Sequence, residues 1–327
     1  MLNIGIIGLG SFGIKRAQAV QHSTKGNLYA VSDINNELSY KISEELKTKH
    51  MQVNELIESP EIHLIIISTP NKFHSELSIK SLEAGKHVLC EKPMAISLIE
   101  AKQMIETSFK TQKQLKIGSN HRFFNSIIEM EKIIKNNEIG EILDFRGSIG
   151  HNGEKIQNTW FWDPSISGGG TLIDNGWHLI DIAQEILGRF STITGNTSNI
   201  YWKNCPVEDY SECTLKTSNG KTASITSSWR KMDGYFEIEL FGTKGILKVD
   251  GRFDKNNNES ISWQIQDSHN SIKSIQFERT YPDTYTKEIN NFIAQIITGN
   301  SLTQHSLENS LNILKLIKDL YSQNNQY

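Results

Sequence analysis

A glycine-rich turn near the start of the chain constrains the fold more than any other feature. The apolar run Leu2 to Ile7 has the pattern of a parallel strand buried on both faces, and it leads directly into GLGSFG at residues 8–13. The following segment, Ile14 to Val20, is predicted to be a helix. A strand, a GxGxxG turn and a helix in this order predict the dinucleotide-binding unit of a Rossmann sheet.

The turn itself contains residues suited to holding a pyrophosphate. Gly8 permits the tight turn, Gly10 lets the backbone approach the phosphates, and Gly13 lets the helix pack on the strand. Ser11 and Phe12 complete the loop, whose helix N-terminus would face the phosphates. A purely structural glycine turn remains the alternative interpretation.

An acidic residue after the second predicted strand bears on the choice of cofactor. Asp33 follows Leu28 to Ser32, at about the distance from the glycine turn that the dinucleotide fingerprint requires. Its carboxylate would accept hydrogen bonds from the adenosine ribose hydroxyls and would repel a 2′-phosphate. Because residues 34–36 contain no Arg or Lys, the sequence favours NAD over NADP.

The alternation of strands and helices continues, and two polar turns end neighbouring strands. Ser68 and Thr69 follow the strand predicted from residue 64, and Glu91-Lys92-Pro93 follows the strand at 87–90. Both turns should lie at the carboxyl edge of the sheet, where such sheets bind ligands. Lys92 could donate to a substrate hydroxyl and favour its alkoxide, although an ordinary solvated lysine is the alternative.

The character of the chain changes near Ser119, where the regular alternation stops. Short alternating runs separated by turn residues follow from about residue 191 to 277, and they predict an antiparallel sheet. We therefore predict an α/β protein with two domains. Residues 1–119 form a Rossmann domain with a doubly wound parallel sheet, and residues 120–327 form an α+β domain with a mainly antiparallel sheet.

A second motif, GGGTLIDNGWH at residues 168–178, places a carboxylate and an imidazole ahead of an apolar helix. If the helix already includes Asp174, then Asp174 and His178 lie four residues apart on one face. A carboxylate beside an imidazole can hold the tautomer of the ring and make it a useful general base. A local capping contact with a structural histidine is the alternative.

Composition excludes several classes of partner. The net charge of −3 comes without a basic block, which argues against nucleic acid and anionic membranes and favours a small-molecule partner. The three cysteines are widely spaced and form no CxxC, which fits a reducing cytoplasm better than disulfides or a thiolate zinc site. No apolar run is long enough for a membrane span.

Taken together, the motifs resemble those of the family named for glucose-fructose oxidoreductase, inositol dehydrogenase and MocA. The matching elements are GLGSFG, Asp33, STPNKFH at 68–74, EKP at 91–93 and the D-x-G-x-H within 174–178. The resemblance implies an N-terminal Rossmann domain and a C-terminal α/β domain. The second domain would have a large open sheet used for homodimer or homotetramer assembly.

The same resemblance implies roles for individual residues. Lys92 would bind the reacting hydroxyl, while Asp174 and His178 match the acid and base of the inositol dehydrogenase branch. The remaining cofactor-binding positions that it implies are Ser68, Thr69, Asn71, His74, Glu91, Asn120 and Trp160. Two departures are Phe161, where members often carry Arg, and Asn175, where many have an apolar residue.

Further polar residues could face a hydroxyl-rich substrate: Arg122, His151, Asn152, Trp162, Asn175 and Tyr285. The resulting hypothesis is an NAD-dependent oxidoreductase acting on a secondary alcohol or ketone of a sugar, cyclitol or nucleotide-sugar derivative. One alternative is a catalytically silent dinucleotide-binding regulator. Another is metal-assisted oxidation with Asp174, His178 and His121 as ligands, against which the chain has no HExxH and no cysteine cluster, so we predict no metal. The identity of the substrate and the direction of the reaction stay open.

Overall fold

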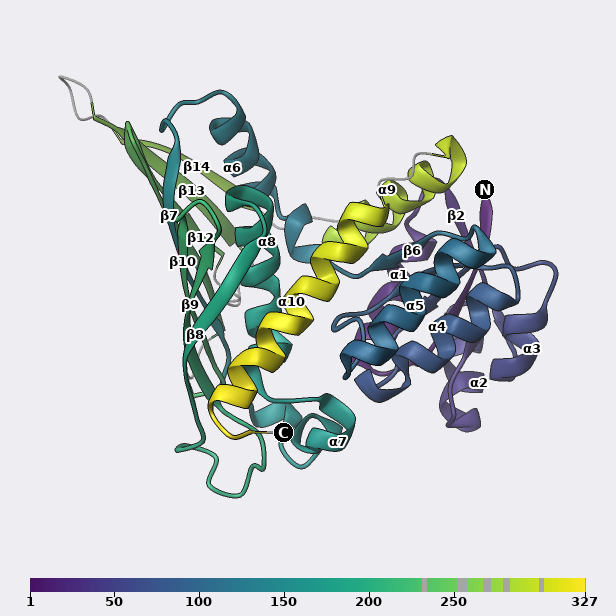
Figure 1. Ribbon diagram of the computed structural model, residues 1–327. Coiled ribbons are helices and arrows are strands. Elements are labelled where there is room, and N and C mark those ends of the chain that lie inside the picture. Colours follow the sequence, from purple (N-terminus) through teal and green to yellow (C-terminus); the bar gives the residue numbers. More distant parts are fainter. Residues whose placement is uncertain (231–233, 252–257, 267–271, 279–282, 300–302, 327) are drawn as a thin grey trace. The chain divides into compact units, whose positions relative to one another are not determined.

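The computed structural model describes the whole chain except residues 231–233, 252–257, 267–271, 279–282, 300–302 and 327. It divides into two compact units, one formed by Met1–Asn120 with Tyr281–Leu311 and the other by His121–Thr280 with Asn312–Tyr327 (Figure 1). No helix in the described part of the chain combines the length and apolar character that a membrane span requires.

The first unit is built on a six-stranded parallel sheet with the order β3-β2-β1-β4-β5-β6. The strands are β1 (Leu2–Ile7), β2 (Gly26–Ser32), β3 (Lys49–His50), β4 (Leu64–Ile67), β5 (His87–Cys90) and β6 (Leu115–Ile117). The strand order reverses between β1 and β4, so right-handed crossovers place the helices of the two halves on opposite faces. This confirms the doubly wound sheet predicted from the sequence.

The helices of the first unit are α1 (Ser11–Gln21), α2 (Asn36–Glu45), α3 (Val53–Glu58), α4 (His74–Glu83), α5 (Leu98–Thr111) and α9 (Thr284–Thr298). A capping box starts α5, with Ser97 Oγ accepting from the Glu100 N–H at 3.3 Å and Glu100 Oε2 accepting from the Ser97 N–H at 3.2 Å.

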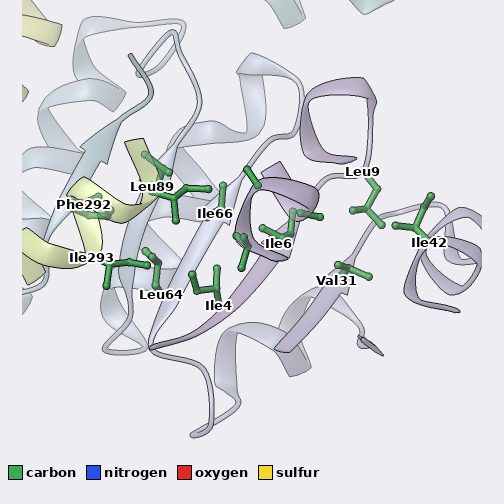
Figure 2. Close-up of a cluster of buried hydrophobic side chains, with 14 residues drawn as sticks. Ile4, Ile6, Leu9, Val31, Ile42, Leu64, Ile66, Leu89, Phe292 and Ile293 are labelled. Atoms are coloured by element: carbon green, nitrogen blue, oxygen red, sulfur yellow. The ribbon is translucent and has the colours of Figure 1, made fainter. Parts of the chain in front are cut away.

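The helix α9 corrects the predicted domain assignment. All of 120–327 is expected in the second domain, but Tyr281–Leu311 belongs to the first unit. Phe292 and Ile293 are fully buried in the same cluster as Ile4, Leu64 and Leu89 of the parallel sheet (Figure 2). Burial of side chains of this size contributes roughly 1.5–3 kcal/mol each, which explains why α9 packs on this sheet.

The second unit contains an eight-stranded sheet with the order β14-β13-β12-β11-β7-β10-β9-β8. Its strands are β7 (Ile142–Gly150), β8 (Phe190–Ser198), β9 (Tyr210–Thr217), β10 (Thr222–Ser228), β11 (Tyr235–Gly242), β12 (Gly245–Asp250), β13 (Asn258–Ile265) and β14 (Ile272–Glu278). The pair β7–β10 is parallel, and the other neighbouring pairs are antiparallel. The predicted mainly antiparallel sheet is confirmed.

Helices cover one face of this sheet (Figure 1). The helices of the second unit are α6 (Asn125–Lys135), α7 (Pro164–Ser167), α8 (Trp177–Leu187) and the C-terminal part of α10 (Thr303–Gln323). The helix α8 packs on β7 and β10, close enough that a Cβ on Gly147 of β7 would lie 3.0 Å from the Leu179 side chain. This contact fixes α8, and the segment before it, against the centre of the sheet.

Candidate active site

The glycine turn of the first unit has the geometry that a bound dinucleotide requires. Gly8 has a φ of +92°, which favours glycine, and a Cβ on Gly13 would lie 1.9 Å from the Gly8 carbonyl oxygen. A Cβ on Gly10 would meet nothing within 4 Å, so the space beside this backbone is open. Gly10 is also the N-cap of α1 and provides no side-chain cap, which leaves the helix N-terminus available to a phosphate.

Asp33 lies directly after β2 and contacts the glycine turn. Its Oδ2 accepts a hydrogen bond from the Leu9 N–H at 2.6 Å, and its Oδ1 accepts from the Asn35 N–H at 2.9 Å. A carboxylate offers about four acceptor positions, so two remain for ribose hydroxyls. The observed bonds hold the carboxylate in place at the end of the strand, as a specific ribose contact requires.

The turn after β4 lies against the glycine turn. A Cβ on Gly8 would fall 2.7–2.8 Å from backbone atoms of Ser68 and Thr69. The hydroxyl oxygens of these two residues are buried, and neither has a hydrogen-bond partner among the described residues. Buried hydroxyls of this kind beside an open glycine turn are compatible with a polar ligand, and the predicted contact of Ser68 and Thr69 with the cofactor stays a prediction.

His74 ties this turn to the EKP turn after β5. Its two ring nitrogens lie 2.8 Å from the Pro93 carbonyl oxygen and 2.9 Å from the Thr69 carbonyl oxygen. Burial lowers the pKa of His74 below its ordinary value, against the opposing effect of these two carbonyls. The role that the structure gives His74 is therefore to bridge two turns, and its predicted contact with the cofactor stays a prediction.

Arg16 is a structural element of this edge that the sequence analysis missed. Its side chain is 0% exposed, and it donates from Nε to Glu91 Oε1 at 2.6 Å and from Nη1 to Glu288 Oε2 at 2.7 Å. Glu288 in turn accepts from the Ser119 N–H at 2.7 Å. Burial alone would raise the pKa of Glu91, but the Arg16 guanidinium outweighs it and holds that pKa below its ordinary value.

This buried ionic triad joins α1, the EKP turn, the end of β6 and α9. It thereby fixes the backbone next to Lys92, which is half-buried at the carboxyl edge of the sheet. The signal in the sequence was an arginine on the expected core side of α1, which is unusual for a charged residue unless it is paired. Of the other predicted cofactor residues, Asn71 and Asn120 are buried, and Asn120 Nδ2 donates to Thr284 Oγ1 at 3.2 Å.

In the second unit the predicted carboxylate and imidazole lie on one continuous helical segment. Asp174 belongs to a π-helical turn, Leu172–Gly176, that runs directly into α8, where His178 is the second residue. π-Helical turns are rare and occur frequently at functional sites. The helix does include Asp174, as the predicted pairing requires, but with a wider turn than an α-helix.

Two further histidines surround these residues. The His151 Nε2 atom lies 4.0 Å from Asp174 Oδ2, and the His178 ring stacks on the His121 ring with centroids 3.7 Å apart and an interplanar angle of 15°. His178 is 8% exposed and Asp174 is half-buried. The second unit therefore gathers one carboxylate and three imidazoles, which are groups suited to moving a proton near neutral pH.

The other predicted substrate and cofactor residues have varied surroundings. Arg122 is engaged by two carboxylates of α8, with Nε donating to Asp181 at 2.6 Å and Nη1 lying 3.0 Å from Glu185. The geometry thus gives Arg122 a structural ion pair, and a substrate contact stays a prediction. In the first unit, the Tyr285 ring packs against the Arg16 guanidinium, whose Cζ atom lies 4.6 Å from the ring centroid.

The remaining candidates lie in the second unit. Asn175 donates to Thr171 Oγ1 at 3.3 Å, and Asn152 Oδ1 accepts from the Glu154 N–H at 3.2 Å. Trp160 stacks on Phe161 with ring centroids 3.9 Å apart, while the buried Trp162 belongs to a hydrophobic cluster formed with Cys205, Val207 and Trp229. Their roles toward ligands stay predictions. Within the described ranges, no group of three His, Cys, Asp or Glu side chains is placed to hold a metal ion.

The fold and the site define a class of protein. A Rossmann unit with an open glycine turn, joined in one chain to a unit that gathers proton-transfer groups, is the architecture of a nicotinamide-dependent oxidoreductase. A profile of the NAD-binding Rossmann domain of the GFO/IDH/MocA oxidoreductases matches residues 2–119, and one of the GFO/IDH/MocA C-terminal domain matches residues 127–248. The chain belongs to this family and is an NAD-dependent oxidoreductase, which confirms the resemblance seen in the motifs.

Similar proteins include several named dehydrogenases. Myo-inositol 2-dehydrogenase of Thermotoga maritima is 27% identical over 310 residues, which cover 91% of this chain and 89% of the relative. Glucose-6-phosphate 3-dehydrogenase of Bacillus subtilis is 33% identical over 266 residues, which cover 76% of this chain and 74% of the relative. A solved levoglucosan dehydrogenase in complex with NADH shares the fold, with a TM-score of 0.86 at 23% identity over 98% of this chain and 96% of that chain.

Proposed function

We propose that the protein transfers a hydride between a secondary alcohol of a sugar, cyclitol or related polyol and NAD. The observation that carries the proposal is the helical segment that holds Asp174 and His178, with His151 4.0 Å from the Asp174 carboxylate. Relatives named for dehydrogenation of a cyclitol and of a sugar phosphate support a hydroxyl-rich substrate.

In this mechanism His178 takes the proton of the reacting hydroxyl, and Asp174 holds its ring in the tautomer that can accept it. Lys92 donates a hydrogen bond to the same oxygen and stabilises the developing alkoxide. When bound, NAD supplies the acceptor for the hydride that leaves the carbinol carbon. The reverse reaction, reduction of a ketone, uses the same side chains in the opposite direction.

Replacement of His178 by Ala separates binding from chemistry. We expect NADH binding, followed by fluorescence titration, to stay within about twofold of wild type, while turnover falls about 10²–10⁴-fold, as for loss of a general base. The substrate screen should combine inositols, free sugars, sugar phosphates and nucleotide-sugars with NAD and with NADP, followed by nicotinamide absorbance. Proportionate loss of NADH binding and turnover in H178A would contradict the catalytic role.

Two other outcomes of that screen are informative. Tight NADH binding by the wild-type chain without turnover of any polyol would favour a dinucleotide-binding regulator. A preference for NADP would show that Asp33 does not select against the 2′-phosphate. Lys92→Ala should lower turnover as well, because the alkoxide would lose its hydrogen-bond donor.

We also propose that the chain forms a homo-oligomer through the face of the eight-stranded sheet opposite α6 and α8. Phe241 pairs with Ile246 across β11 and β12, and Ile246 is 38% exposed, while the neighbouring Leu143 is 46% exposed. The Arg146 guanidinium covers the Phe241 ring at 4.6 Å. Light scattering should give a dimer or tetramer for the wild-type chain and a smaller species for Phe241→Glu.

A further inference from the structure

A buried carboxylate outside the predicted site, Glu208, holds the backbone of the GGGTLIDNGWH segment. It lies just before β9 and is 0% exposed. Its Oε2 accepts from the Gly170 N–H at 2.7 Å, and its Oε1 accepts from the Leu172 N–H at 3.0 Å and from the Tyr321 hydroxyl at 2.7 Å. Its own carbonyl accepts from the Thr171 N–H at 3.0 Å, so three successive amides of the segment bind this one residue.

Two glycines of the segment, Gly169 and Gly170, are explained by close contacts with Tyr321 and Glu208. A Cβ on Gly170 would lie 2.1 Å from the Glu208 carbonyl oxygen, and a Cβ on Gly169 would lie 2.3 Å from the Tyr321 hydroxyl. Gly169 also has a φ of +154°, which L side chains rarely adopt. Gly169 and Gly170 therefore let the chain approach Tyr321 of α10 and Glu208.

The ionised form of Glu208 matches its surroundings. Both carboxylate oxygens accept hydrogen bonds from groups that can donate, and a carboxylate is an acceptor only. Burial raises the pKa of Glu208, and the hydrogen bonds from Leu172, Tyr321 and Gly170 oppose that rise. The negative charge of the ionised form strengthens the hydrogen bonds from these N–H and O–H donors.

The same backbone leads to the proton-transfer groups. Gly170 donates its N–H to Glu208, and its carbonyl accepts from the Asp174 N–H at 3.1 Å. Leu172, the other amide bound by Glu208, is the first residue of the π-helical turn that contains Asp174 and runs into the helix of His178. Glu208 thus binds one amide just before the π-helical turn, that of Gly170, and the amide of the first residue of the turn, Leu172.

We propose that Glu208 is a positioning residue for the hydride-transfer reaction: by binding the Gly170 and Leu172 amides, it fixes the π-helical turn so that Asp174 and His178 meet the substrate hydroxyl in reactive geometry. Tyr321 orients the carboxylate from the C-terminal helix. The inference rests on the proposed function. A displacement of about 1 Å in such groups costs on the order of 10²-fold in rate. Loss of the Glu208 contact should therefore lower turnover and leave cofactor binding unchanged.

The test replaces Glu208 by Gln, which keeps the shape and turns one acceptor oxygen into a donor. We expect kcat to fall about 10–100-fold. The polyol KM and the NADH Kd should stay within about threefold of wild type, and amide hydrogen exchange in peptides covering 168–178 should become faster.

A matched control exists in the same unit. Glu259 of β13 is 3% exposed and accepts hydrogen bonds from the Asn125 N–H at 3.2 Å and the Ser126 N–H at 3.0 Å, at the start of α6. Glu259→Gln removes a similarly buried carboxylate that does not contact the catalytic segment. It should lower stability to a similar degree while leaving kcat within about twofold of wild type.

The second variant is Tyr321→Phe, which removes the hydroxyl donor and leaves the carboxylate in place. It should lower kcat about threefold, and it tests the same contact if E208Q cannot be purified in a folded form. Equal kcat values for E208Q and E259Q would overturn the inference, as would unchanged kcat in Y321F if only that variant folds.

Failure of the proposed function gives a different result. If the wild-type chain binds NADH and turns over no polyol, the proposed activity is refuted, and hydrogen exchange then decides the positioning role by itself. Faster exchange of 168–178 in E208Q than in E259Q supports that role, and equal exchange overturns it.

Discussion

Replacement of Arg16 by Met tests the ionic triad that supports the cofactor edge. The variant keeps a long apolar side chain in the core but removes a guanidinium that lies 2.6 Å from Glu91 and 2.7 Å from Glu288. Glu288 is 0% exposed at its side chain and Glu91 is 14% exposed, so water compensates little of the loss.

Removing one partner of a buried ion pair typically costs about 3–5 kcal/mol, because a buried charge is left without compensation. Here two carboxylates lose their partner, so we expect a value in the upper half of that range. In a unit of this size, such a loss lowers the unfolding temperature by roughly 10 °C or more. The double variant Arg16→Met with Glu288→Gln should recover at least 1 kcal/mol, since it removes the most deeply buried unpaired charge.

The pH dependence of the variant should have the opposite sign from that of the wild-type chain. In the wild type the pKa of Glu91 is held below its ordinary value, so its contribution to stability is present at neutral pH and is lost only as the pH falls below about 4.5. Without Arg16, burial alone raises the pKa of Glu91. The destabilisation should then be greatest at neutral pH and shrink as the pH falls toward 4.5, the ordinary pKa of this carboxyl.

The change in the free energy of unfolding of the first unit is measured by urea unfolding at several pH values. Hydrogen exchange of peptides from residues 1–120 monitors the transition. Tryptophan fluorescence is unsuitable for this unit, because all six tryptophans lie in the second. Arg122→Met is the control, because the Arg122 side chain is 22% exposed in its ion pairs and its loss should cost less. A cost of less than 1 kcal/mol for R16M, or no recovery in the double variant, would refute the assignment of the triad as a stabilising element.

Three further measurements test the surroundings of particular side chains. Burial, together with the nearby Lys113 and His63, lowers the pKa of His87 to about 4. The Nδ1 atom of His87 accepts a hydrogen bond from the Gln114 N–H at 3.0 Å, so protonation of His87 favours the unfolded chain. Stability should therefore fall by about 1–2 kcal/mol, discounted for partial exposure, as the pH drops from about 6.5 to about 4, and His87→Gln should abolish this dependence in urea titrations. All three cysteine thiols are buried, which raises their pKa values. The native chain should therefore be inert to a thiol-specific disulfide reagent, and the unfolded chain should react at three thiols. Rapid reaction of the native chain would contradict the burial. Ser97→Ala should cost about 1 kcal/mol through loss of the α5 capping box, and a variant as stable as wild type would show that the Glu100 N–H finds another partner.

Local patterns were sufficient to predict the parallel sheet of the first unit and the position of the cofactor turn. The glycine turn, the buried apolar strands and the capping box of α5 are each specified by residues close together in the sequence. The strands β10 and β11 lie within the region of alternating runs predicted at about 191–277, for the same reason. The family followed from the order of motifs that each needs only a few residues.

Tertiary packing decided what short patterns could not. The central strand β7 was missed because two glycines and two charged residues interrupt its apolar alternation, and it is a strand because β10 and β11 pair with it on both sides. The helix α9 joined the first unit because its apolar stripe fits the parallel sheet, a match between segments more than 200 residues apart that no local pattern reveals.

The site divides in the same way. The sequence by itself was sufficient to propose the residues for the chemistry, namely the glycine turn, Lys92, Asp174 and His178, because each is part of a short motif. Only the tertiary structure decided what holds them. Arg16 and Glu208 are single charged residues in ordinary sequence surroundings, and they acquire a role because folding buries each of them among partners from distant segments, where an uncompensated charge would be too costly to keep.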